Sequence, residues 1–279
     1  MAYDPDLRAE ALRRLHVGEF PVEIAAALGV TDSSVTYWAR RAGIVLSKSE
    51  GLKRSYETKR RLHHRTRTYT LNEAAFEGDL TPGTAWVLGH IFGNGYICTQ
   101  GEKWTGFQVC GDLDICQKIA LVIGSDVEAK AIKGCYEVRF FSDRLVESLT
   151  RYGLHPAKTY DMRWPDLPAA FVKHFVRGFW EADGTVTSRK SNGSVLPVLS
   201  ATSCSEAFMR PLHGIVRVVA KSQANLFSCQ PKKGHRFHMS SFVGNPAVRL
   251  GDWLWKDVPV DIRGDRKYAR LQEVRRHYG

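Results

Sequence analysis

The chain has 279 residues and a formal net charge of +11, from 40 lysines and arginines against 29 acidic residues. This length predicts a sizeable core, built as one duplicated domain with a small accessory domain. The charge favours a polyanionic partner, with nucleic acid ahead of an anionic membrane surface. No apolar run approaches a membrane span and no signal peptide is recognised, which argues against a membrane or secreted protein. The six cysteines form no CxxC pair and indicate reduced thiols in a cytosolic protein.

The first 45 residues are predicted to form a small all-α domain of three helices, over residues 6–15, 21–28 and 31–41. The string EIAAALGVTDSSVTYWARRAGI resembles a helix-turn-helix, with Gly29 in the turn, Val35 inward and Trp38 anchoring the third helix. In that motif the third helix enters the major groove. Its outward residues are the expected DNA contacts: Ser33, Ser34, Thr36, Tyr37, Arg40 and Arg41. A helical domain without a ligand is the alternative.

Residues 46–79 are polar and basic, and they hold too little apolar surface to order themselves by burial. They are predicted to be a linker that lies along phosphates, which gives affinity and salt dependence without sequence choice. The expected phosphate contacts are Arg54, Lys59, Arg60 and Arg61. A solvated tether is the alternative.

The remainder of the chain carries an internal duplication. The stretch VLGHIFGNG, ending at Gly95, aligns with VRGFWEADG, ending at Gly184, at an offset of 89 residues. Small residues four positions apart form a stripe on each of these helices: Gly89 and Gly93 in one, Gly178 and Ala182 in the other. Two such stripes predict a helix pair with closely approaching backbones. Each following glycine is expected to end its helix in a left-handed turn, which sets Asn94 and Asp183 side by side.

The elements repeat in the order helix, two strands, helix, two strands, helix, so the fold class is α+β with a duplicated αββαββα unit. The halves span residues 80–165 and 166–279. In the first half, strands are predicted at 96–99, 105–110, 128–132 and 135–141, and helices at 81–93, 114–123 and 143–152. In the second half, a helix ends at residue 183, strands are predicted at 184–188, 195–203, 224–230 and 236–242, and helices at 206–220 and 245–254.

The motif pair resembles the LAGLIDADG homing endonuclease family in its single-chain, two-motif form. The resemblance covers roughly residues 80–272 and is good in the second motif, through Gly178, Glu181, Ala182, Asp183 and Gly184. It implies a pseudo-dimer with two antiparallel saddle sheets over the DNA major groove. It also implies a metal-dependent DNA endonuclease, with Asp183 and the carbonyl of Ala182, and equivalently Asn94 and Gly93, at the metal. Mg²⁺ is the expected ion, with Mn²⁺ or Ca²⁺ as substitutes.

The family also closes each half-domain with a phrase that contains a lysine. Residues 153–159 match this phrase well, and residues 262–268 (IRGDRKY) resemble its second copy. The resemblance implies that Lys158 and Lys267 are catalytic residues that stabilise the negative charge of the transition state, one for each DNA strand.

One position departs from the family pattern: Asn94 stands where members carry a metal-binding acid. An amide offers a metal a neutral oxygen and no charge. Three interpretations follow, namely a natural DNA binder that has lost cutting, an enzyme that nicks one strand, or a deliberately substituted version of a cleaving enzyme.

Polar residues in or beside the predicted strands complete the expected DNA contacts, because strand alternation turns one set toward the duplex. They are Gln108, Arg139, Arg189, Lys190, Lys232, Lys233 and Arg236.

The predicted function is site-specific cleavage of double-stranded DNA by a monomer, at a long, non-palindromic site. A mobile genetic element is the expected setting, nucleoid-associated or phage-encoded in a bacterial host. The alternative is a non-cleaving transcription regulator that uses the nuclease fold as a clamp. A zinc site at Cys229, His235 and His238 is a weaker alternative, because their spacing follows strand alternation.

Overall fold

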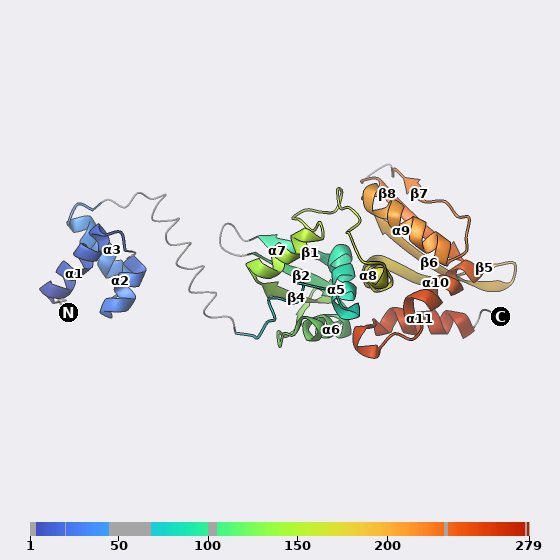
Figure 1. Cartoon of the computed structure of the whole chain (residues 1–279), viewed down its shortest axis with the longest axis horizontal. Helices are drawn as coiled ribbons and strands as arrows, with labels where there is room; N and C mark the ends of the chain where they lie inside the picture. The colour runs from blue at the N-terminus through green and yellow to red at the C-terminus, as the bar shows by residue number, and fades with distance from the viewer. Residues whose placement is uncertain are drawn as a thin grey trace. The chain divides into compact units, whose positions relative to one another are not determined.

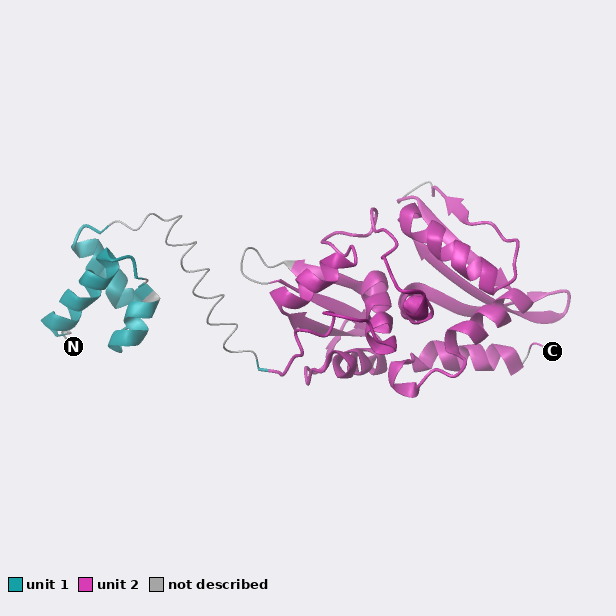
Figure 2. Cartoon of the chain, viewed as in Figure 1, with its two compact units in different colours: residues 1–68, 100–103 teal, residues 69–99, 104–279 magenta. Residues whose placement is uncertain are grey.

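The computed structural model describes residues 4–19, 21–44, 68–99, 105–231, 234–276 and 278. The chain divides into two compact units (Figure 2). One contains the first three helices, and the other contains what is described from Tyr69 onward. Each unit has its own hydrophobic core.

The first unit is the predicted three-helix domain, built from α1 (Pro5–His16), α2 (Pro21–Leu28) and α3 (Asp32–Arg41). Gly29 ends α2 with a φ of 66°, in the left-handed region that a glycine adopts easily. Thr31 caps α3, because its side chain accepts a hydrogen bond from the backbone N–H of Ser34. One core joins the three helices: Ala11, Leu15, Ile24, Ala25, Val35, Trp38 and Ala39.

The second unit repeats the predicted αββαββα order (Figure 1). The first copy consists of α5 (Pro82–Asn94), β1 (Gly95–Thr99), β2 (Thr105–Gly111), α6 (Leu113–Ile123), β3 (Lys130–Ile132), β4 (Cys135–Phe141) and α7 (Asp143–Arg151). The second consists of α8 (Ala169–Asp183), β5 (Gly184–Ser191), β6 (Ser194–Ser203), α9 (Glu206–Val219), β7 (Phe227–Cys229), β8 (Phe237–Val243) and α10 (Asn245–Trp255). Strands β3 and β7 are shorter than the sequence predicts.

Each copy forms one four-stranded antiparallel sheet, in the orders β1-β2-β4-β3 and β5-β6-β8-β7. Helices α6 and α7 contact the first sheet, and α9 and α10 contact the second. Strand alternation sends apolar pairs toward these helices, such as Phe107 with Phe140 and Leu199 with Phe242, all of them buried. The intervening residues form the opposite face of each sheet, which we call the outer face.

Helices α5 and α8 pack backbone to backbone, as the small-residue stripes predict. A Cβ added to Gly89 would lie 2.1 Å from the carbonyl oxygen of Phe175, and one added to Gly178 would lie 2.0 Å from that of Trp86. No side chain fits at either position, since a larger residue would push the helices apart. The predicted close helix pair is therefore confirmed, and it fixes the ends of both helices beside each other.

The predicted left-handed turns at the ends of this pair are wrong. Gly95 and Gly184 are extended, with φ/ψ of −102°/163° and −80°/164°, and each is the first residue of a strand. Glycine is needed there for room instead. A Cβ at Gly95 would lie 2.6 Å from the Cα of Ile91, and one at Gly184 would lie 2.4 Å from the carbonyl oxygen of Trp180.

Two segments differ from the sequence expectation. Residues 69–79, expected to be linker, pack on the first half: Leu71 pairs with Ser125, and Phe76 joins the core. The expected closing phrase, residues 262–268, begins at the end of a short 3-10 helix, η1 (Val260–Ile262), and runs into an additional helix, α11 (Asp265–Arg276). Within the described ranges, no helix is both long and apolar enough to cross a membrane.

Candidate functional site

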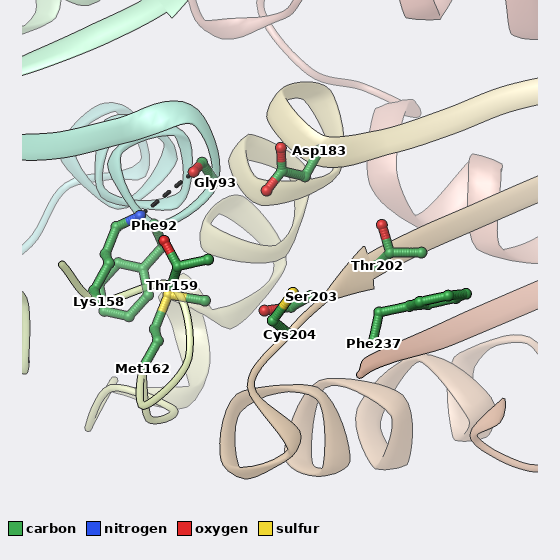
Figure 3. A pocket seen from close by; sticks show the side chains of 10 residues that line it. All are labelled: Phe92, Gly93, Lys158, Thr159, Met162, Asp183, Thr202, Ser203, Cys204 and Phe237. Atoms are coloured by element: carbon green, nitrogen blue, oxygen red, sulfur yellow. Dashed lines mark hydrogen bonds between the residues drawn. The ribbon is translucent and has the colours of Figure 1, made fainter. Parts of the chain in front are cut away.

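Two pockets lie at the ends of α5 and α8, and each takes residues from both halves. The first, here the Asp183 pocket, has a volume of about 240 Å³ and is lined by Gly93, Lys158 and Asp183 together with Thr202 and Phe237 of the second sheet (Figure 3). The second, here the Asn94 pocket, has a volume of about 510 Å³. Its walls include Asn94, Ala182 and Arg266, with Cys110 and Cys135 of the first sheet. The two motifs therefore open toward the outer faces of both sheets.

Asp183 is exposed at the end of α8 and faces α5. A Cβ on Gly93 would lie 3.5 Å from Asp183 Oδ2, so the carboxylate sits against the neighbouring motif. Partial burial of the carboxylate between the helix ends raises the pKa of Asp183, while the positive charges of Lys158 and Lys267 oppose that rise. A carboxylate that is exposed, and whose charge is costly here without a partner, is suited to hold a cation.

Asn94 occupies the matching position of the first motif but behaves differently. Its Nδ2 donates a hydrogen bond to the carbonyl oxygen of Ala182 over 3.3 Å. That carbonyl is one that the family resemblance assigns to a metal. Asn94 thus places a donor where an acid would place a second negative charge.

The two predicted lysines occupy equivalent places in the two halves. Lys158 Nζ donates to the carbonyl oxygen of Gly93 over 3.4 Å (Figure 3). Lys267 Nζ donates to that of Ala182 over 3.0 Å and to that of Trp180 over 3.1 Å. Gly93 and Ala182 are themselves equivalent positions of the duplication. Each lysine therefore rests on the negative end of one motif helix, a favourable place for a cation.

The surroundings of both lysines lower the pKa of their side chains. Burial lowers the pKa of Lys158 to about 8, and Asp183 partly opposes this. Burial, followed by the charge of Arg266, lowers the pKa of Lys267 to about 8, against the nearby acids. An added anion, such as a phosphate, favours the charged form of both side chains.

A buried polar network, which sequence reasoning did not find, lies beneath the Asn94 pocket. Glu181 is buried and accepts hydrogen bonds from the indole N–H of Trp86 over 2.7 Å and that of Trp255 over 2.6 Å. His90 Nε2 lies 3.4 Å and Arg177 Nε 3.9 Å from its carboxylate. A glutamate among the small and apolar residues of the second motif was the one available signal. Its partners are too distant in sequence to be inferred.

The outer face of the first sheet carries two of the predicted DNA contacts. Arg139 is exposed and pairs in register with Gln108. Gln108 is buried, and its amide is engaged by Tyr96 and Glu137, so it does not present a free edge to a base. On this face, Arg139 is therefore accessible to a ligand, whereas the neighbouring Gln108 is buried.

The second sheet separates two residues that the sequence grouped together. Arg189 pairs with Leu196 and Lys190 with Val195, so these exposed neighbours point to opposite faces of β5. Arg189 shares the outer face with Thr185. Arg236 is exposed just before β8, and Lys232 and Lys233 lie outside the described residues.

In the first unit, five of the six expected contacts are exposed along α3: Ser33, Thr36, Tyr37, Arg40 and Arg41. Ser34 is half-buried and its hydroxyl is hydrogen-bonded to Thr31 over 2.8 Å. Arg54, Lys59, Arg60 and Arg61 of the expected linker fall outside the described residues.

No protein-family model matches the chain, and a search of curated proteins finds no relative. Solved structures do resemble it. These are LAGLIDADG homing endonucleases. The meganuclease I-SmaMI, bound to uncleavable DNA, has a TM-score of 0.48 at 12% identity over 70% of this chain and 90% of its own. The LAGLIDADG meganuclease I-AabMI, bound to uncleaved DNA, has a TM-score of 0.46 at 14% identity over 71% and 90%.

A third similar structure is the homing endonuclease I-WcaI bound to its DNA recognition sequence, with a TM-score of 0.46 at 12% identity over 81% of this chain and 94% of its own. The proteins found are thus of the family that the two sequence motifs resemble. Their sequence identity to this chain is 12 to 14%, and their TM-scores lie below 0.5.

The oxygen donors at the Asp183 pocket fit a divalent cation of the Mg²⁺ type. Such an ion is commonly held by one or two carboxylates together with substrate phosphates and water. Asp183 would supply the carboxylate. The carbonyl oxygen of the preceding residue, Ala182, accepts hydrogen bonds from Asn94 Nδ2 and Lys267 Nζ, and Ala182 lines the Asn94 pocket. Among the described residues, no cluster of three His, Cys, Asp or Glu side chains is suited to a metal. The expected zinc ligand His238 is buried and hydrogen-bonded to Ser228 over 2.8 Å.

Proposed function

We propose that this chain is a site-specific DNA endonuclease of the LAGLIDADG type whose two cutting positions are unequal. In this proposal, the monomer binds a long, non-palindromic duplex along the outer faces of both sheets. The observation that carries it is the set of charges at the Asp183 pocket. One exposed carboxylate shares the pocket with Lys158 and also interacts with the charge of Lys267, and both lysines rest on the ends of the paired helices. The N-terminal unit supplies additional DNA contacts through α3.

The proposal assigns a role to each of the following residues. Asp183 holds a divalent cation, assisted by the carbonyl of Ala182. Lys158 and Lys267 stabilise the additional negative charge that develops on a phosphate under attack. A bound Mg²⁺ polarises the phosphate and lowers the pKa of an attacking water. Asn94 contributes no charge, so the position that depends on it is weak and one strand is cut in preference to the other.

The second candidate function is a regulator that binds DNA without cutting it. The hydrogen bond from Asn94 Nδ2 to the Ala182 carbonyl favours this alternative, because it occupies an oxygen that a metal would need. Against it stands Asp183, an exposed carboxylate in a pocket that also contains Lys158.

The test begins with the selection of bound duplexes from a random pool in Ca²⁺, and the selected site is then placed in a supercoiled plasmid. With Mg²⁺, the chain as given should nick the plasmid, Asn94→Asp should linearise it, and Asp183→Asn should do neither. The double variant Asn94→Asp/Asp183→Asn is the matched control, since it should nick the opposite strand, as read on a denaturing gel. Linearisation by the given chain contradicts the inequality. Tight binding without cutting by all four proteins would contradict the nuclease proposal and favour the DNA-binding regulator.

A further inference from the structure

The outer face of the first sheet holds a row of hydrogen-bonded side chains across three strands. Tyr96 of β1 pairs in register with Gln108 of β2, which pairs with Arg139 of β4. The Tyr96 hydroxyl donates to Gln108 Oε1 over 2.9 Å. Gln108 Nε2 donates to Glu137 Oε2 over 2.8 Å, and Arg139 Nη2 donates to the same oxygen over 3.0 Å. One carboxylate therefore fixes both the amide and the guanidinium.

The carboxylate of Glu137 is an unusual group for this surface. It is buried, with 5% of the residue exposed, on the outer face of a protein whose net charge is +11. A buried acid repels phosphate, so its presence does not serve backbone binding. Its contacts instead go to Arg139, whose positive charge it balances and whose side chain it holds in one place.

Arg139 is nevertheless half exposed, at 48% of its side chain. Within the described part of the chain, its hydrogen bond runs from Nη2 to Glu137, which leaves the second Nη2 hydrogen and both Nη1 hydrogens for a ligand. Two parallel N–H donors match the O6 and N7 acceptors of guanine in the major groove. Because the side chain is already held, less rotamer freedom is lost when it binds.

The row lies on the same face of the sheet as the residues that line the Asn94 pocket. Cys110 and Cys135 have the same strand parity as Gln108 and Arg139, and both line the Asn94 pocket. A duplex that reaches the motif ends therefore passes over the row. The equivalent face of the second sheet carries the exposed Arg189 among hydroxyl groups, at Thr185, Thr187, Ser200, Thr202 and Ser241, and apolar side chains such as Met239. Among the described strand residues on that face there is no acid that could hold Arg189 as Glu137 holds Arg139.

We propose that Arg139, positioned by Glu137 and Gln108, reads one guanine in the half-site that faces the first sheet. The inference rests on the proposed DNA binding and adds its specificity. Arg139 is the base-reading residue, while Glu137 is a positioning residue that acts through it. On the second sheet, the described strands present Arg189 without such a positioning acid, so we expect it to contact phosphate instead.

The test uses the full chain and fluorescence anisotropy on the selected duplex in Ca²⁺. Each G·C pair of the site is replaced in turn, and at the most sensitive position guanine is also replaced by 7-deazaguanine, which lacks the N7 acceptor. One guanine on the first-sheet side should lose roughly 5- to 150-fold in affinity on replacement. Arg139→Ala should remove that preference, so that the four base pairs bind alike.

Glu137→Gln provides the readout that a merely structural residue would not move. Binding to unrelated duplexes should tighten because an acid is lost, while the guanine preference should fall. Arg189→Ala, on the outer face of the second sheet, is the comparison. It should weaken binding and leave the guanine preference unchanged. Circular dichroism and melting temperature verify that each variant is folded.

The outcomes separate the inference from the proposed function. If Arg139→Ala weakens all duplexes equally and the guanine preference persists, Arg139 is a phosphate contact and the inference is overturned. If 7-deazaguanine binds as well as guanine, it is overturned as well. If the folded wild-type chain binds no duplex at all, the proposed function itself fails.

Discussion

The two halves of the second unit share one architecture but carry different chemistry on corresponding surfaces. The outer face of the first sheet bears a buried acid, an amide, a phenol and an exposed guanidinium, joined by hydrogen bonds. The outer face of the second bears hydroxyl groups, apolar side chains and the exposed Arg189, which has no acid beside it among the described strand residues of that face. The difference predicts that, in the proposed complex, the first half is more selective toward the duplex than the second.

The same contrast continues where the motif helices meet. Offset by 89 residues, Phe92 corresponds to Glu181 and Phe175 to Trp86. On one side the rings of Phe92 and Phe175 pack 5.1 Å apart, and on the other Trp86 donates to Glu181. In the aligned stretches, Val87 and Val176, Gly89 and Gly178, and Gly95 and Gly184 are identical. The glycines stand where an added Cβ would meet backbone atoms, so close backbone packing accounts for their presence in both halves.

The largest effect is expected where the halves are identical. Gly89→Ala and Gly178→Ala each force a methyl group against a backbone carbonyl, at 2.1 and 2.0 Å. Each should lower the free energy of unfolding by more than about 4 kcal/mol or prevent folding, and by similar amounts. Gly214→Ala in α9, where nothing lies within 4 Å of the added carbon, should instead stabilise by about 0.5–1 kcal/mol. Urea denaturation measures all three, and unequal losses at the two glycines would contradict the equivalence.

A smaller effect distinguishes the two sides of the interface. Glu181→Gln removes the buried carboxylate charge near Arg177 and sets an amide NH₂ against one of the two indole N–H groups. It should lower the free energy of unfolding by about 3–5 kcal/mol. Phe92→Leu at the equivalent position should cost only about 1–1.5 kcal/mol, because it changes apolar volume alone. Denaturation curves at neutral pH compare them. Equal costs would indicate that the polar network adds nothing beyond packing.

The lysines should make DNA affinity depend on pH. Their pKa values are about 8 in the fold against an ordinary 10.5, so the unfolded chain holds more protons between these values and stability rises with pH in that window. Phosphate favours the charged form, so DNA affinity should fall above about pH 8 as protons must be taken up. Lys158→Met and Lys267→Met should each remove about half of the slope of log Kd against pH. An unchanged slope in both would exclude them from phosphate binding.

The smallest effect concerns two neighbours on β5. Arg189 lies on the outer face and Lys190 on the opposite face. Arg189→Ala should reduce the slope of log affinity against log salt by about 1, as the loss of one phosphate contact does. Lys190→Ala should leave it unchanged. Titrations from low to moderate salt measure both slopes, and equal reductions would show that both side chains reach the duplex.

Much of this architecture was predictable because small residues at fixed spacing have few alternatives. The pattern of Gly89 and Gly178 predicts close helices, and the resemblance of two phrases to the family's closing phrase implied Lys158 and Lys267. The left-handed turn predicted at Gly95 is wrong because glycine is favoured both at positive φ and where a Cβ would clash, and the sequence does not distinguish the two cases. Residues 69–79 looked too polar to pack, yet Phe76 is buried in the core, with Leu71 and Ala75 packed against it. Glu181 was missed because its partner Trp86 is 95 residues away.

The unequal interface also determines which halves can pair. Two copies of the first half would set each Trp86 against a phenyl ring, leaving both indole N–H groups without an acceptor. Two copies of the second half would set each Glu181 against Phe175, leaving both carboxylates short of donors. Only the mixed pair brings the indole N–H of Trp86 to the carboxylate of Glu181, and an unmet buried polar group is costly. A chain cut between its halves should therefore reassemble as a heterodimer in preference to either homodimer.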